Sequence, residues 1–288
     1  MAARNLVCLG FGFTAQALAR ALTAEPWTIT GTTRKQNSAA TSSVRMVQWP
    51  GSDLSPVLAQ ATHIVSSVPP RAGADPALDL IRSHLGRMPR LEWVGLLSTT
   101  GVYGDHGGNW VDEDTPLVMR EHRGGMRAAQ DAEWMALYRD HHLPLHRFRL
   151  AGIYGPGRSA LDKVRDGTAR RIVKPGQVFS RIHVADIVQV LRASFAQPSP
   201  GRAYNLADDL PGPPQDVIAY AAELLGKPVP PDIAFETADL SPMARSFYSD
   251  NKRVRNTRIK QELGVTLLYP DYRAGLNAIL ADEAAGAP

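Results

Sequence analysis

Short apolar runs alternate with longer amphipathic runs along the first half of the chain. Short runs rich in Val, Ile and Leu are typical of strands buried on both faces, and apolar residues three and four apart indicate helices. We therefore expect strands at 5–10, 27–34, 44–49, 63–68, 91–99 and 143–155. The helices expected between them lie at 14–25, 54–60, 76–88 and 121–134. This alternation predicts an α/β fold with a doubly wound parallel sheet, the Rossmann fold.

The rhythm changes after residue 155. The chain then shows a short helix with turns, a strand leading into a helix over 180–195, and a further strand at 203–208. Helices at 214–226 and 251–264 follow, separated by proline-rich loops. The predicted division is a Rossmann domain over 1–155, completed by about 180–206, and a smaller C-terminal cap made of 156–179 and 207–288.

Composition and charge narrow the class of protein. The 288 residues are 44% hydrophobic and 21% charged, which gives ample core material for a globular fold. The net charge of +4 comes from scattered residues rather than a basic block, so we expect no nucleic-acid partner. No apolar run approaches the about 18 residues of a membrane helix, and we expect neither a membrane partner nor a secretory signal. The single cysteine, Cys8, lies in an apolar run, which favours a buried thiol and a cytoplasmic location.

The turn after the first strand reads GFGFTA, with Gly10, Gly12 and Ala15 in a G-x-G-x-x-A pattern. The first glycine permits a tight turn, the second lets a pyrophosphate approach the backbone, and the alanine allows close packing of helix on strand. The helix expected over 14–25, which opens at Thr14 directly after Phe13, would offer its N-terminal amides to the anion. Because the motif follows a strand and opens a helix, it predicts a dinucleotide site.

The second strand ends in GTTRK, where NAD-binding sites usually carry an acidic residue for the ribose hydroxyls. A carboxylate there would repel a 2′-phosphate. Here Thr32, Thr33, Arg34 and Lys35 present hydroxyls and positive charge instead. The sequence therefore favours NADP(H) over NAD(H), with a solvated loop arginine as the alternative interpretation of Arg34.

Hydroxyl side chains follow the fifth strand in LLSTTGVYGD (96–105), at the end of the sheet where ligands of open α/β folds bind. Together with GFGFTA, RLAGIYGPG (149–157), RIHVADI (181–187) and NKR before ELG (251–264), this stretch resembles the extended short-chain dehydrogenase/reductase superfamily. The resemblance is to its NAD(P)-dependent epimerase/dehydratase branch, and it covers nearly the whole chain.

The resemblance implies site residues at several matching positions. Thr99 matches the Ser/Thr that hydrogen-bonds the substrate oxygen, although a backbone-capping role at a strand end is the alternative. Asp53 and Leu54 match the loop that passes the adenine. The remaining positions line the cofactor after the fourth, fifth and sixth strands: Ser67, Val68, Pro69, Ser98, Ile153 and Tyr154.

The catalytic pair of that family is a tyrosine with a lysine four residues later on the next helix, which here is EHRGGMRAAQDAEW. Arg123 stands at the tyrosine position and Arg127 at the lysine position. A guanidinium stays protonated near neutrality, so Arg123 cannot exchange a proton there. Arg127 is expected either to hold a ribose or substrate anion, or to pair with Asp131 one turn on.

Other groups are weighed for proton transfer. Tyr103 is a candidate, although the resemblance implies that it packs or lines the substrate pocket. His122 lies beside Arg123 but points about 100° away on a helix. Two acidic residues of NWVDED (109–114), Asp112 and Glu113, read chiefly as surface acidity.

His183 and Asp186 are expected to tie a strand to its helix, with Asp186 near an N-cap. The scattered histidines and the lone cysteine lack metal-ligand spacing, so we expect no metal.

Two functions fit these observations. The first is an NADP(H)-dependent oxidoreductase or epimerase/dehydratase-like enzyme that acts on a small polar, anionic or sugar-like substrate bound by the cap. The alternative is a dinucleotide-binding sensor of the same fold that performs no turnover. The resemblance further implies a homodimer formed through the two helices beside the catalytic strand.

Overall fold

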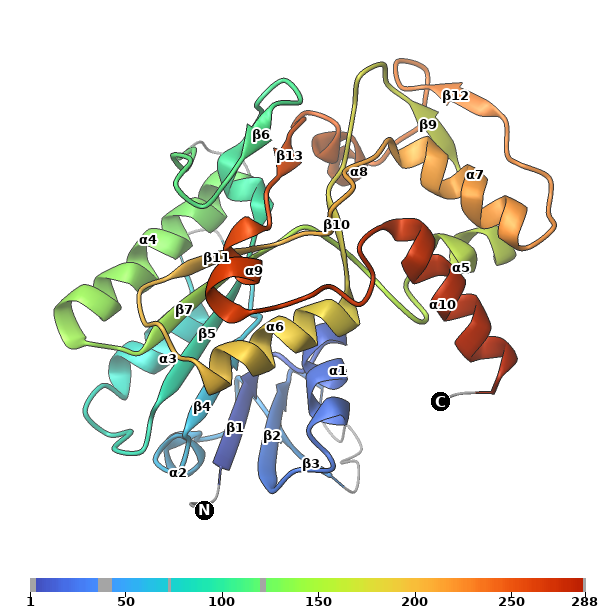
Figure 1. Ribbon diagram of the computed structural model, residues 1–288. Coiled ribbons are helices and arrows are strands. Elements are labelled where there is room, and N and C mark those ends of the chain that lie inside the picture. Colours follow the sequence, from blue (N-terminus) through green and yellow to red (C-terminus); the bar gives the residue numbers. More distant parts are fainter. Residues whose placement is uncertain (1–3, 36–42, 72–73, 120–122, 287–288) are drawn as a thin grey trace. The chain divides into compact units, whose positions relative to one another are not determined.

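The computed structural model describes residues 4–35, 43–71, 74–119 and 123–286 of the chain (Figure 1). The chain forms two compact units, each made of three separate stretches. Unit 1 comprises Met1–Val102, Val118–Arg149 and Val188–Tyr204, and unit 2 comprises Tyr103–Leu117, Leu150–Ile187 and Asn205–Pro288. Residues 103–117 and 150–155, which the sequence analysis assigns to the first domain, belong to unit 2.

A seven-stranded sheet forms the centre of the fold in the order β11-β7-β5-β4-β1-β2-β3. Its strands are β1 (Arg4–Leu9), β2 (Trp27–Thr33), β3 (Val44–Gln48), β4 (His63–Ser66), β5 (Trp93–Thr99), β7 (Leu145–Leu150) and β11 (Ala203–Leu206). The four pairs from β3 to β5 are parallel. The predicted doubly wound α/β fold is therefore confirmed.

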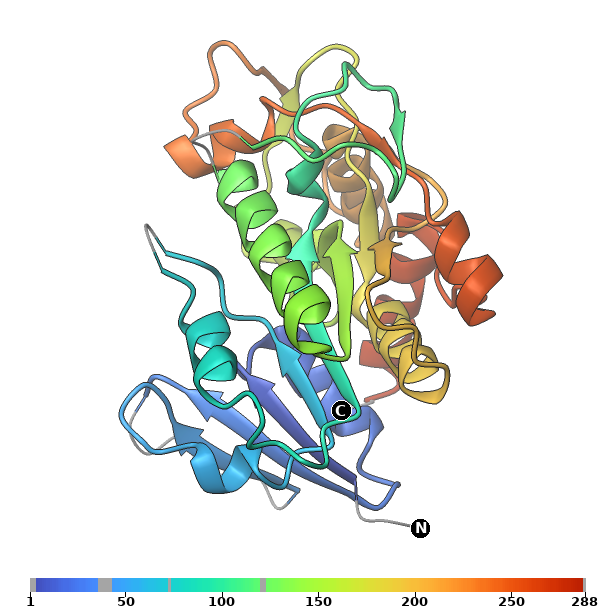
Figure 2. The ribbon, with the colours of Figure 1, turned by 90° about the vertical axis from the view of Figure 1, so that its left-hand side faces the viewer.

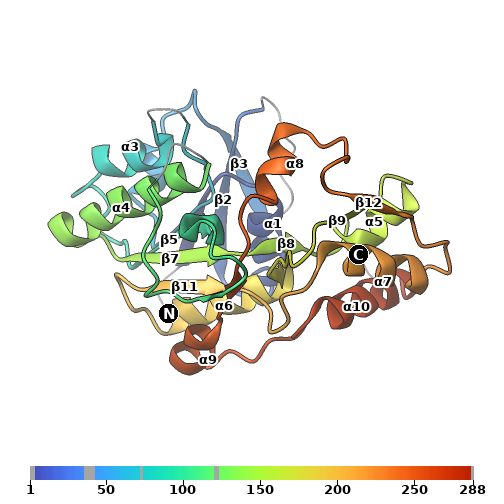
Figure 3. The same cartoon turned by 90° about the horizontal axis from the view of Figure 1, so that it is seen from above.

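Helices cover both faces of the sheet of unit 1. They are α1 (Phe13–Ala21), α2 (Ser55–Leu58), α3 (Pro76–Ser83), α4 (Arg123–His141) and the end of α6 (Val184–Ala196). Figure 2 shows α3 and α4 side by side in front of the strands, and Figure 3 shows α4 and α6 on opposite sides of β5. Apolar residues of α2, α3 and α4 share one core with inward residues of β1, β4 and β5.

The opposite face of the sheet is packed with aromatic side chains. The ring of Trp93 on β5 lies 4.6 Å from that of Phe195 on α6, and its Nε1 donates to Ser194 Oγ at 3.0 Å. His63 on β4 also contacts Phe195, at 4.9 Å. Because neighbouring residues of a strand point to opposite faces, Trp93 and Val94 fill the two different cores, which fixes the register of β5.

The strand order reverses between β1 and β4, since β2 and β3 continue on one side and β5, β7 and β11 on the other. In doubly wound sheets a crevice opens outside the carboxyl ends of the two strands at such a point. The segments that follow β1 and β4 begin at Gly10 and Ser67, so the fold places these two loops beside each other.

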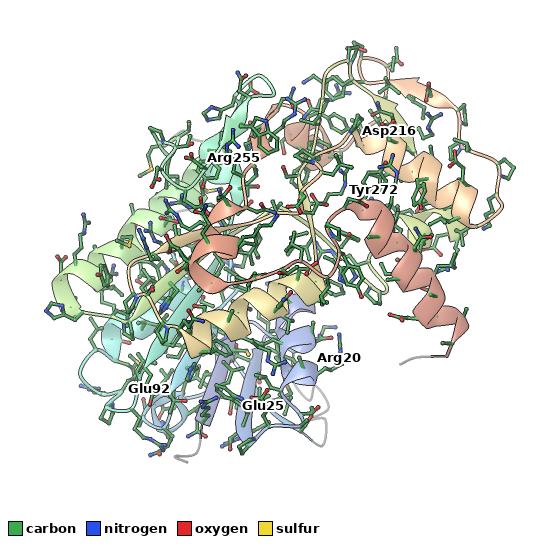
Figure 4. The ribbon with its side chains drawn as sticks, in the orientation of Figure 1. Arg20, Glu25, Glu92, Asp216, Arg255 and Tyr272 are labelled. Atoms are coloured by element: carbon green, nitrogen blue, oxygen red, sulfur yellow. The ribbon has the colours of Figure 1, made fainter. Side chains whose placement is uncertain are left out.

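Unit 2 contains short strands and helices outside the central sheet. Its strands pair in parallel as β8 (Gly152–Tyr154) with β10 (Arg181–His183), β9 (Arg171–Val173) with β12 (Asp232–Ala234), and β6 (Trp110–Val111) with β13 (Arg253–Val254). Its helices are α5 (Ala160–Arg165), α7 (Pro214–Leu224), α8 (Pro242–Phe247), α9 (Thr257–Leu263) and α10 (Tyr272–Ala284). Tyr272, labelled in Figure 4, anchors α10 in an apolar core shared with α5 and α7.

Two predicted elements differ from the structure. The strand expected over 143–155 is two strands, because Ala151 N donates to Leu206 O and Gly152 N to Ser180 O, so the chain changes partner at this point. The helix expected over 251–264 begins only at Thr257, since Arg253 and Val254 instead form β13. A two-residue strand carries too little periodicity to be recognised from sequence.

Candidate functional site

The turn between β1 and α1 carries two glycines with different roles. Gly10 has a φ of +85°, and a β-carbon on it would lie 2.8 Å from Ser67 Oγ, so the fold itself requires glycine there. At Gly12, apart from the glycine and its two chain neighbours, no heavy atom of the described residues lies within 4 Å of the position of a β-carbon. The space over the Gly12 backbone is therefore open to a ligand.

The helix α1 begins directly after Gly12 without a side-chain cap from the described part of the chain. Its first turn contains no acidic residue, so the positive end of the helix dipole is not neutralised locally. Thr14 and Ala15 are buried, which holds the start of α1 against the sheet, and Phe13 is half-buried. This N-terminus is suited to an anion such as a pyrophosphate.

The end of β2 is tied to the glycine turn through Thr32. Its Oγ1 accepts the amide of Gly10 at 2.8 Å and donates to Cys8 O at 3.3 Å, and Thr32 O accepts Phe11 N at 2.9 Å. The expectation that the Thr32 hydroxyl faces a ligand is therefore wrong, because the side chain is 1% exposed. Its role is to hold the turn.

The next residues do reach the surface. Thr33 is half-buried and its Oγ1 accepts Lys35 N at 3.2 Å, while Arg34 and Lys35 are exposed. The segment GTTRK thus presents guanidinium and ammonium groups with no carboxylate of its own. Such a surface is compatible with an additional phosphate.

The loop after β4 packs directly on the glycine turn. Ser67 Oγ donates to Gly10 O at 2.9 Å, and Ser67 N donates to Leu9 O at 3.0 Å. Val68 is half-buried and Pro69 is exposed. The structure therefore brings together Gly10 and Ser67, two positions that the sequence analysis assigns to the same site.

Asp53 and Leu54, assigned to the adenine, have structural roles of their own. Asp53 Oδ1 accepts Ser55 Oγ at 2.6 Å and Ser55 N at 2.9 Å, and these bonds lower the pKa of the exposed Asp53 carboxyl. Leu54 is 2% exposed and belongs to the core beneath α2. Because the Leu54 side chain is enclosed, this position has chiefly its backbone to offer a ligand.

Two buried hydroxyls lie at the carboxyl ends of β4 and β5. Ser66 pairs in register with Leu96, and Ser98 lies two residues further, so both side chains point to the same face of the sheet. Within the described residues neither Oγ has a hydrogen-bond partner. Orphaned buried hydroxyls mark places where water or a ligand completes the bonding. Thr99 Oγ1 accepts Gly101 N at 3.1 Å and keeps its hydrogen for donation.

Arg127 on α4 is bound to the end of β5. Its Nη2 donates to Leu97 O at 2.6 Å and its Nη1 donates to Gln130 Oε1 at 2.8 Å. Gln130 Nε2 in turn donates to Asp75 Oδ2 at 2.6 Å, and Trp134 Nε1 donates to the same oxygen at 2.8 Å. We call Arg127, Gln130, Asp75 and Trp134 the α4 network.

The alternative pairing of Arg127 with Asp131 is wrong. Asp131 Oδ1 instead lies 2.6 Å from Arg147 Nη1 and 3.4 Å from Arg149 Nη2, both on β7. Asp131 is 1% exposed. The carboxylate thus joins α4 to β7, whereas Arg127 joins α4 to β5.

The remaining catalytic candidates are placed as follows. Arg123 is the first residue of α4, but its side chain and all of His122 lie outside the described residues. Tyr103 is fully buried in unit 2, and its hydroxyl donates to Asn205 Oδ1 at 2.7 Å. Tyr103 thus packs in a core, as the family resemblance implies.

Ile153 and Tyr154, expected beside the nicotinamide, belong to β8 of unit 2. Ile153 is half-buried. The Tyr154 hydroxyl donates to Asp271 O at 3.3 Å, its ring lies 5.1 Å from that of His183, and burial raises its pKa above the usual range. The Tyr154 side chain is therefore part of the core of unit 2.

Glu113 was expected on the surface, but its side chain is 3% exposed. Its Oε1 accepts Asn205 N at 2.7 Å, and burial raises its pKa. Asp112 instead organises a turn by accepting Thr115 N and Oγ1 at 3.0 Å. The acidic cluster therefore divides into one buried and one turn-forming carboxylate.

RIHVADI does link a strand to its helix, but the N-cap of that helix is His183 and not Asp186. Ala185 N donates to His183 Nδ1 at 3.2 Å, so His183 caps α6, and burial lowers its pKa to about 4. Asp186 accepts Leu268 N at 2.6 Å and Tyr269 N at 3.2 Å. Asp186 is not the N-cap and instead holds the segment before α10.

A tyrosine and a lysine four residues apart do occur outside α4, at Tyr248 and Lys252. Tyr248 packs on the rings of Phe179 and Phe235, 5.3 Å and 5.1 Å away. Lys252 Nζ donates to Gly104 O at 2.8 Å, and burial lowers its pKa. The two residues follow the end of α8 rather than sharing a helix face, so their spacing does not reproduce the family's pair.

Sequence reasoning missed Asp75, although its signal was present. An aspartate directly before a proline and an amphipathic run is typical of a helix N-cap. Asp75 Oδ1 indeed accepts Ala77 N and Leu78 N at the start of α3. Among the described residues no group of His, Cys, Asp and Glu could hold a metal, and no helix is long and apolar enough to cross a membrane.

No protein-family model matches the chain. A solved structure of a functionally unknown conserved protein from Silicibacter pomeroyi is 54% identical, covers 97% of this chain and 99% of its own, and has a TM-score of 0.91. Protein YeeZ of Escherichia coli (strain K12) is 26% identical over 93% of this chain and 97% of its own length.

A likeness of fold extends to enzymes. The dTDP-glucose 4,6-dehydratase from Bacillus anthracis, solved in complex with NAD, superposes with a TM-score of 0.75 over 98% of this chain and 97% of its own, at 17% identity. The expected likeness in fold to the NAD-dependent epimerases and dehydratases is thereby confirmed.

Proposed function

The chain belongs to the same family as the conserved protein from Silicibacter pomeroyi, and on this premise we propose that it is an NADP(H)-dependent oxidoreductase or epimerase/dehydratase-like enzyme. Its substrate is a small polar molecule, anionic or sugar-like. The observation that carries the proposal is the open space at Gly12 over the uncapped N-terminus of α1. The fold itself does not require glycine at this position, whereas a bound pyrophosphate would, because a side chain there would block its approach to the backbone.

Several residues would hold the dinucleotide. Gly10 and Gly12 form the turn, and the amides at Phe13, Thr14 and Ala15 face the pyrophosphate. Thr33 and Arg34 bind the 2′-phosphate, because a guanidinium and a hydroxyl favour an additional anion that a carboxylate would repel. The other positions are Asp53 and Leu54 at the adenine and Ser67, Val68, Pro69 and Ser98 toward the nicotinamide. When bound, the dinucleotide supplies hydride transfer.

At the chemical end, Thr99 provides a hydroxyl hydrogen for a substrate oxygen. Its Oγ1 already accepts Gly101 N, which fixes the side chain and leaves its hydrogen available for donation. Arg127 cannot exchange protons near neutrality, and its guanidinium is bound to Leu97 O and Gln130. Proton transfer by this chain therefore differs from that of the extended short-chain dehydrogenases/reductases, which use a tyrosine and a lysine.

One observation favours the alternative function, a dinucleotide sensor without turnover. The helix in the place of the family's catalytic helix carries arginines at both catalytic positions. A protein that retains the phosphate end and lacks the usual proton donor is suited to binding a dinucleotide and reporting on it. Incubation with NADPH and NADP⁺ in a metabolite extract separates the two functions, because turnover consumes a metabolite. A net oxidoreductase also changes absorbance at the nicotinamide band, whereas an epimerase or dehydratase regenerates its dinucleotide and is followed by metabolite loss alone.

Thermal unfolding with NADPH and NADH tests the cofactor assignment. NADPH is expected to raise the melting temperature more than NADH at equal concentration, because tighter binding to the folded state stabilises it more. Arg34→Asp should reverse this preference. Equal shifts in the unmodified protein, or an unchanged preference in Arg34→Asp, would contradict the assignment of the 2′-phosphate to Arg34.

A further inference from the structure

The helix α4 places one arginine against the carboxyl end of β5 and, through two buried side chains, against the loop after β4. We propose that Arg127 is a positioning residue for the dinucleotide site, which acts through the β4 and β5 ends rather than by touching the ligand. This inference rests on the proposed function. It differs from a ribose-binding role for Arg127, and the two have separable consequences.

The guanidinium of Arg127 makes hydrogen bonds in two directions. Two of its nitrogens bind different acceptors, Leu97 O at 2.6 Å and Gln130 Oε1 at 2.8 Å. The planar fork of arginine makes these two bonds in fixed directions, which a single ammonium group does not reproduce. Leu97 C=O shares a peptide plane with Ser98 N, so Arg127 fixes the orientation of the peptide that leads into Ser98 and Thr99.

Gln130 connects Arg127 to the loop after β4. Gln130 Nε2 donates to Asp75 Oδ2 at 2.6 Å and approaches Val68 O at 3.4 Å. The direction of the amide is set, because a carboxylate only accepts and a guanidinium only donates. Gln130 is 3% exposed, so its contacts are with protein groups rather than with a bound molecule.

Asp75 anchors the other end of the network. Its two oxygens accept four bonds in all, from Ala77 N, Leu78 N, Gln130 and Trp134. The carboxylate therefore holds the N-terminus of α3 and the buried face of α4 at once. Because Asp75 is 7% exposed and Trp134 is fully buried, the network is rigidly enclosed at this end.

The consequence concerns one half of the proposed ligand. The network contacts the end of β5 and the segment after β4, which under the proposed function face the nicotinamide half. The turn at Gly10 and Gly12 and the exposed Arg34, which face the phosphates of the adenosine half, are held by different bonds, such as Thr32 Oγ1 to Gly10 N. Loss of Arg127 should therefore weaken binding of the whole dinucleotide and leave binding of its adenosine half unchanged.

The test measures two dissociation constants by calorimetry, for NADPH and for 2′,5′-ADP, which represents the adenosine half alone. In Arg127→Gln the constant for NADPH is expected to rise about tenfold, with that for 2′,5′-ADP unchanged. The matched control Arg82→Gln removes a half-exposed arginine that pairs with Asp79 on α3, and it should change neither constant. An unchanged NADPH constant in Arg127→Gln, or an equal loss for both ligands, would overturn the inference.

Gln130→Met separates positioning from direct contact. The variant removes the hydrogen bonds that link Arg127 to Asp75, and it does so at a buried side chain that a ligand does not contact. If Arg127 acts as a positioning residue, NADPH binding should weaken and 2′,5′-ADP binding should stay normal. Unchanged NADPH binding in Gln130→Met would refute the inference.

Hydrogen exchange without ligand keeps the inference testable apart from the proposed function. In Arg127→Gln and Gln130→Met the amides of 67–71 and 97–103 should exchange faster than in the unmodified protein and in Arg82→Gln. Unchanged exchange in both segments overturns the positioning role. If the unmodified protein binds neither NADPH nor 2′,5′-ADP, the proposed function fails, while the exchange result still decides whether the network holds the two strand ends.

Discussion

The hydroxyl of Thr32 accepts the amide of Gly10 across two neighbouring strands, at a distance of 2.8 Å. This bond joins the end of β2 to the turn after β1 and satisfies a main-chain donor that a Gly-rich turn would otherwise leave unpaired. The conformation of the turn thus depends on a side chain 22 positions later in the sequence.

Replacement of this hydroxyl tests its contribution to stability. In Thr32→Val the shape is kept but the Gly10 amide loses its acceptor, so the free energy of unfolding should fall by about 1–3 kcal/mol. Thr32→Ser retains the oxygen and should lose less. Urea denaturation measures both, and equal stability of the valine variant and the unmodified protein would show that the bond contributes nothing.

The two glycines of the turn should respond in opposite ways to alanine. Gly12→Ala places a methyl group in open space at a φ of −95°, so the melting temperature should hardly change while NADPH affinity falls about tenfold or more. Gly10→Ala meets Ser67 and a positive φ, so it should destabilise the fold by about 1–3 kcal/mol. Calorimetric titration and thermal unfolding distinguish the two effects, and normal NADPH binding by Gly12→Ala would remove the main support for the pyrophosphate site.

Asp131 is expected to be a critical buried charge. Asp131→Asn leaves the guanidinium groups of Arg147 and Arg149 without their carboxylate, and their side chains are 14% and 3% exposed. The free energy of unfolding should fall by about 3–5 kcal/mol. Glu133→Gln, on the same helix with a side chain 59% exposed, is the matched control and should change stability by about 0.5 kcal/mol or less. Similar losses in both variants would argue against a special role for the buried pair.

We expect the free energy of unfolding to depend on pH through the buried carboxyl of Asp208. It is 1% exposed, neither oxygen has a hydrogen-bond partner among the described residues, and burial raises its pKa to about 8 despite the nearby Arg181. In the unfolded chain the carboxyl ionises near pH 4. The folded state then binds more protons than the unfolded state between about pH 4 and 8, so this group's contribution to stability declines as pH rises through that window.

Asp208→Asn should remove that decline. The variant should be more stable than the unmodified protein at pH 8, by about 2–5 kcal/mol, and the difference should vanish toward pH 4. Urea titrations at several pH values measure it. A constant difference between the two proteins across the range would show that Asp208 does not titrate in this way.

The sequence was sufficient for features that depend on local spacing. Alternating apolar runs gave the strands and helices of unit 1, and the glycine pattern located the turn at Gly10 and Gly12 correctly because its context was local. It was also sufficient to place Arg123 and Arg127 on one helix. The partners beneath that helix were not predictable, because Leu97 lies 30 positions from Arg127 and Val68 lies 62 positions from Gln130.

The same limit explains the errors. Thr32 lies at a strand end with polar residues that are typical of a ligand site, but its hydroxyl accepts the amide of Gly10 in the turn after the neighbouring strand. Glu113 reads as surface acidity because its run is acidic, yet a backbone amide of β11 holds it inside. A polar residue is assigned to water or to the interior by its three-dimensional partners, and periodicity carries no information about them.

The interrupted path of the chain has a consequence for how the protein is made. The seven-stranded sheet receives its outer strand β11 from residues beyond 200, and unit 2 begins with residues 103–117 yet ends with the final helix. During synthesis neither unit is complete when the ribosome has passed residue 155, and β7 then waits with an unpaired edge. Truncated products should consequently aggregate rather than fold, and this protein should be expressed as one uninterrupted chain.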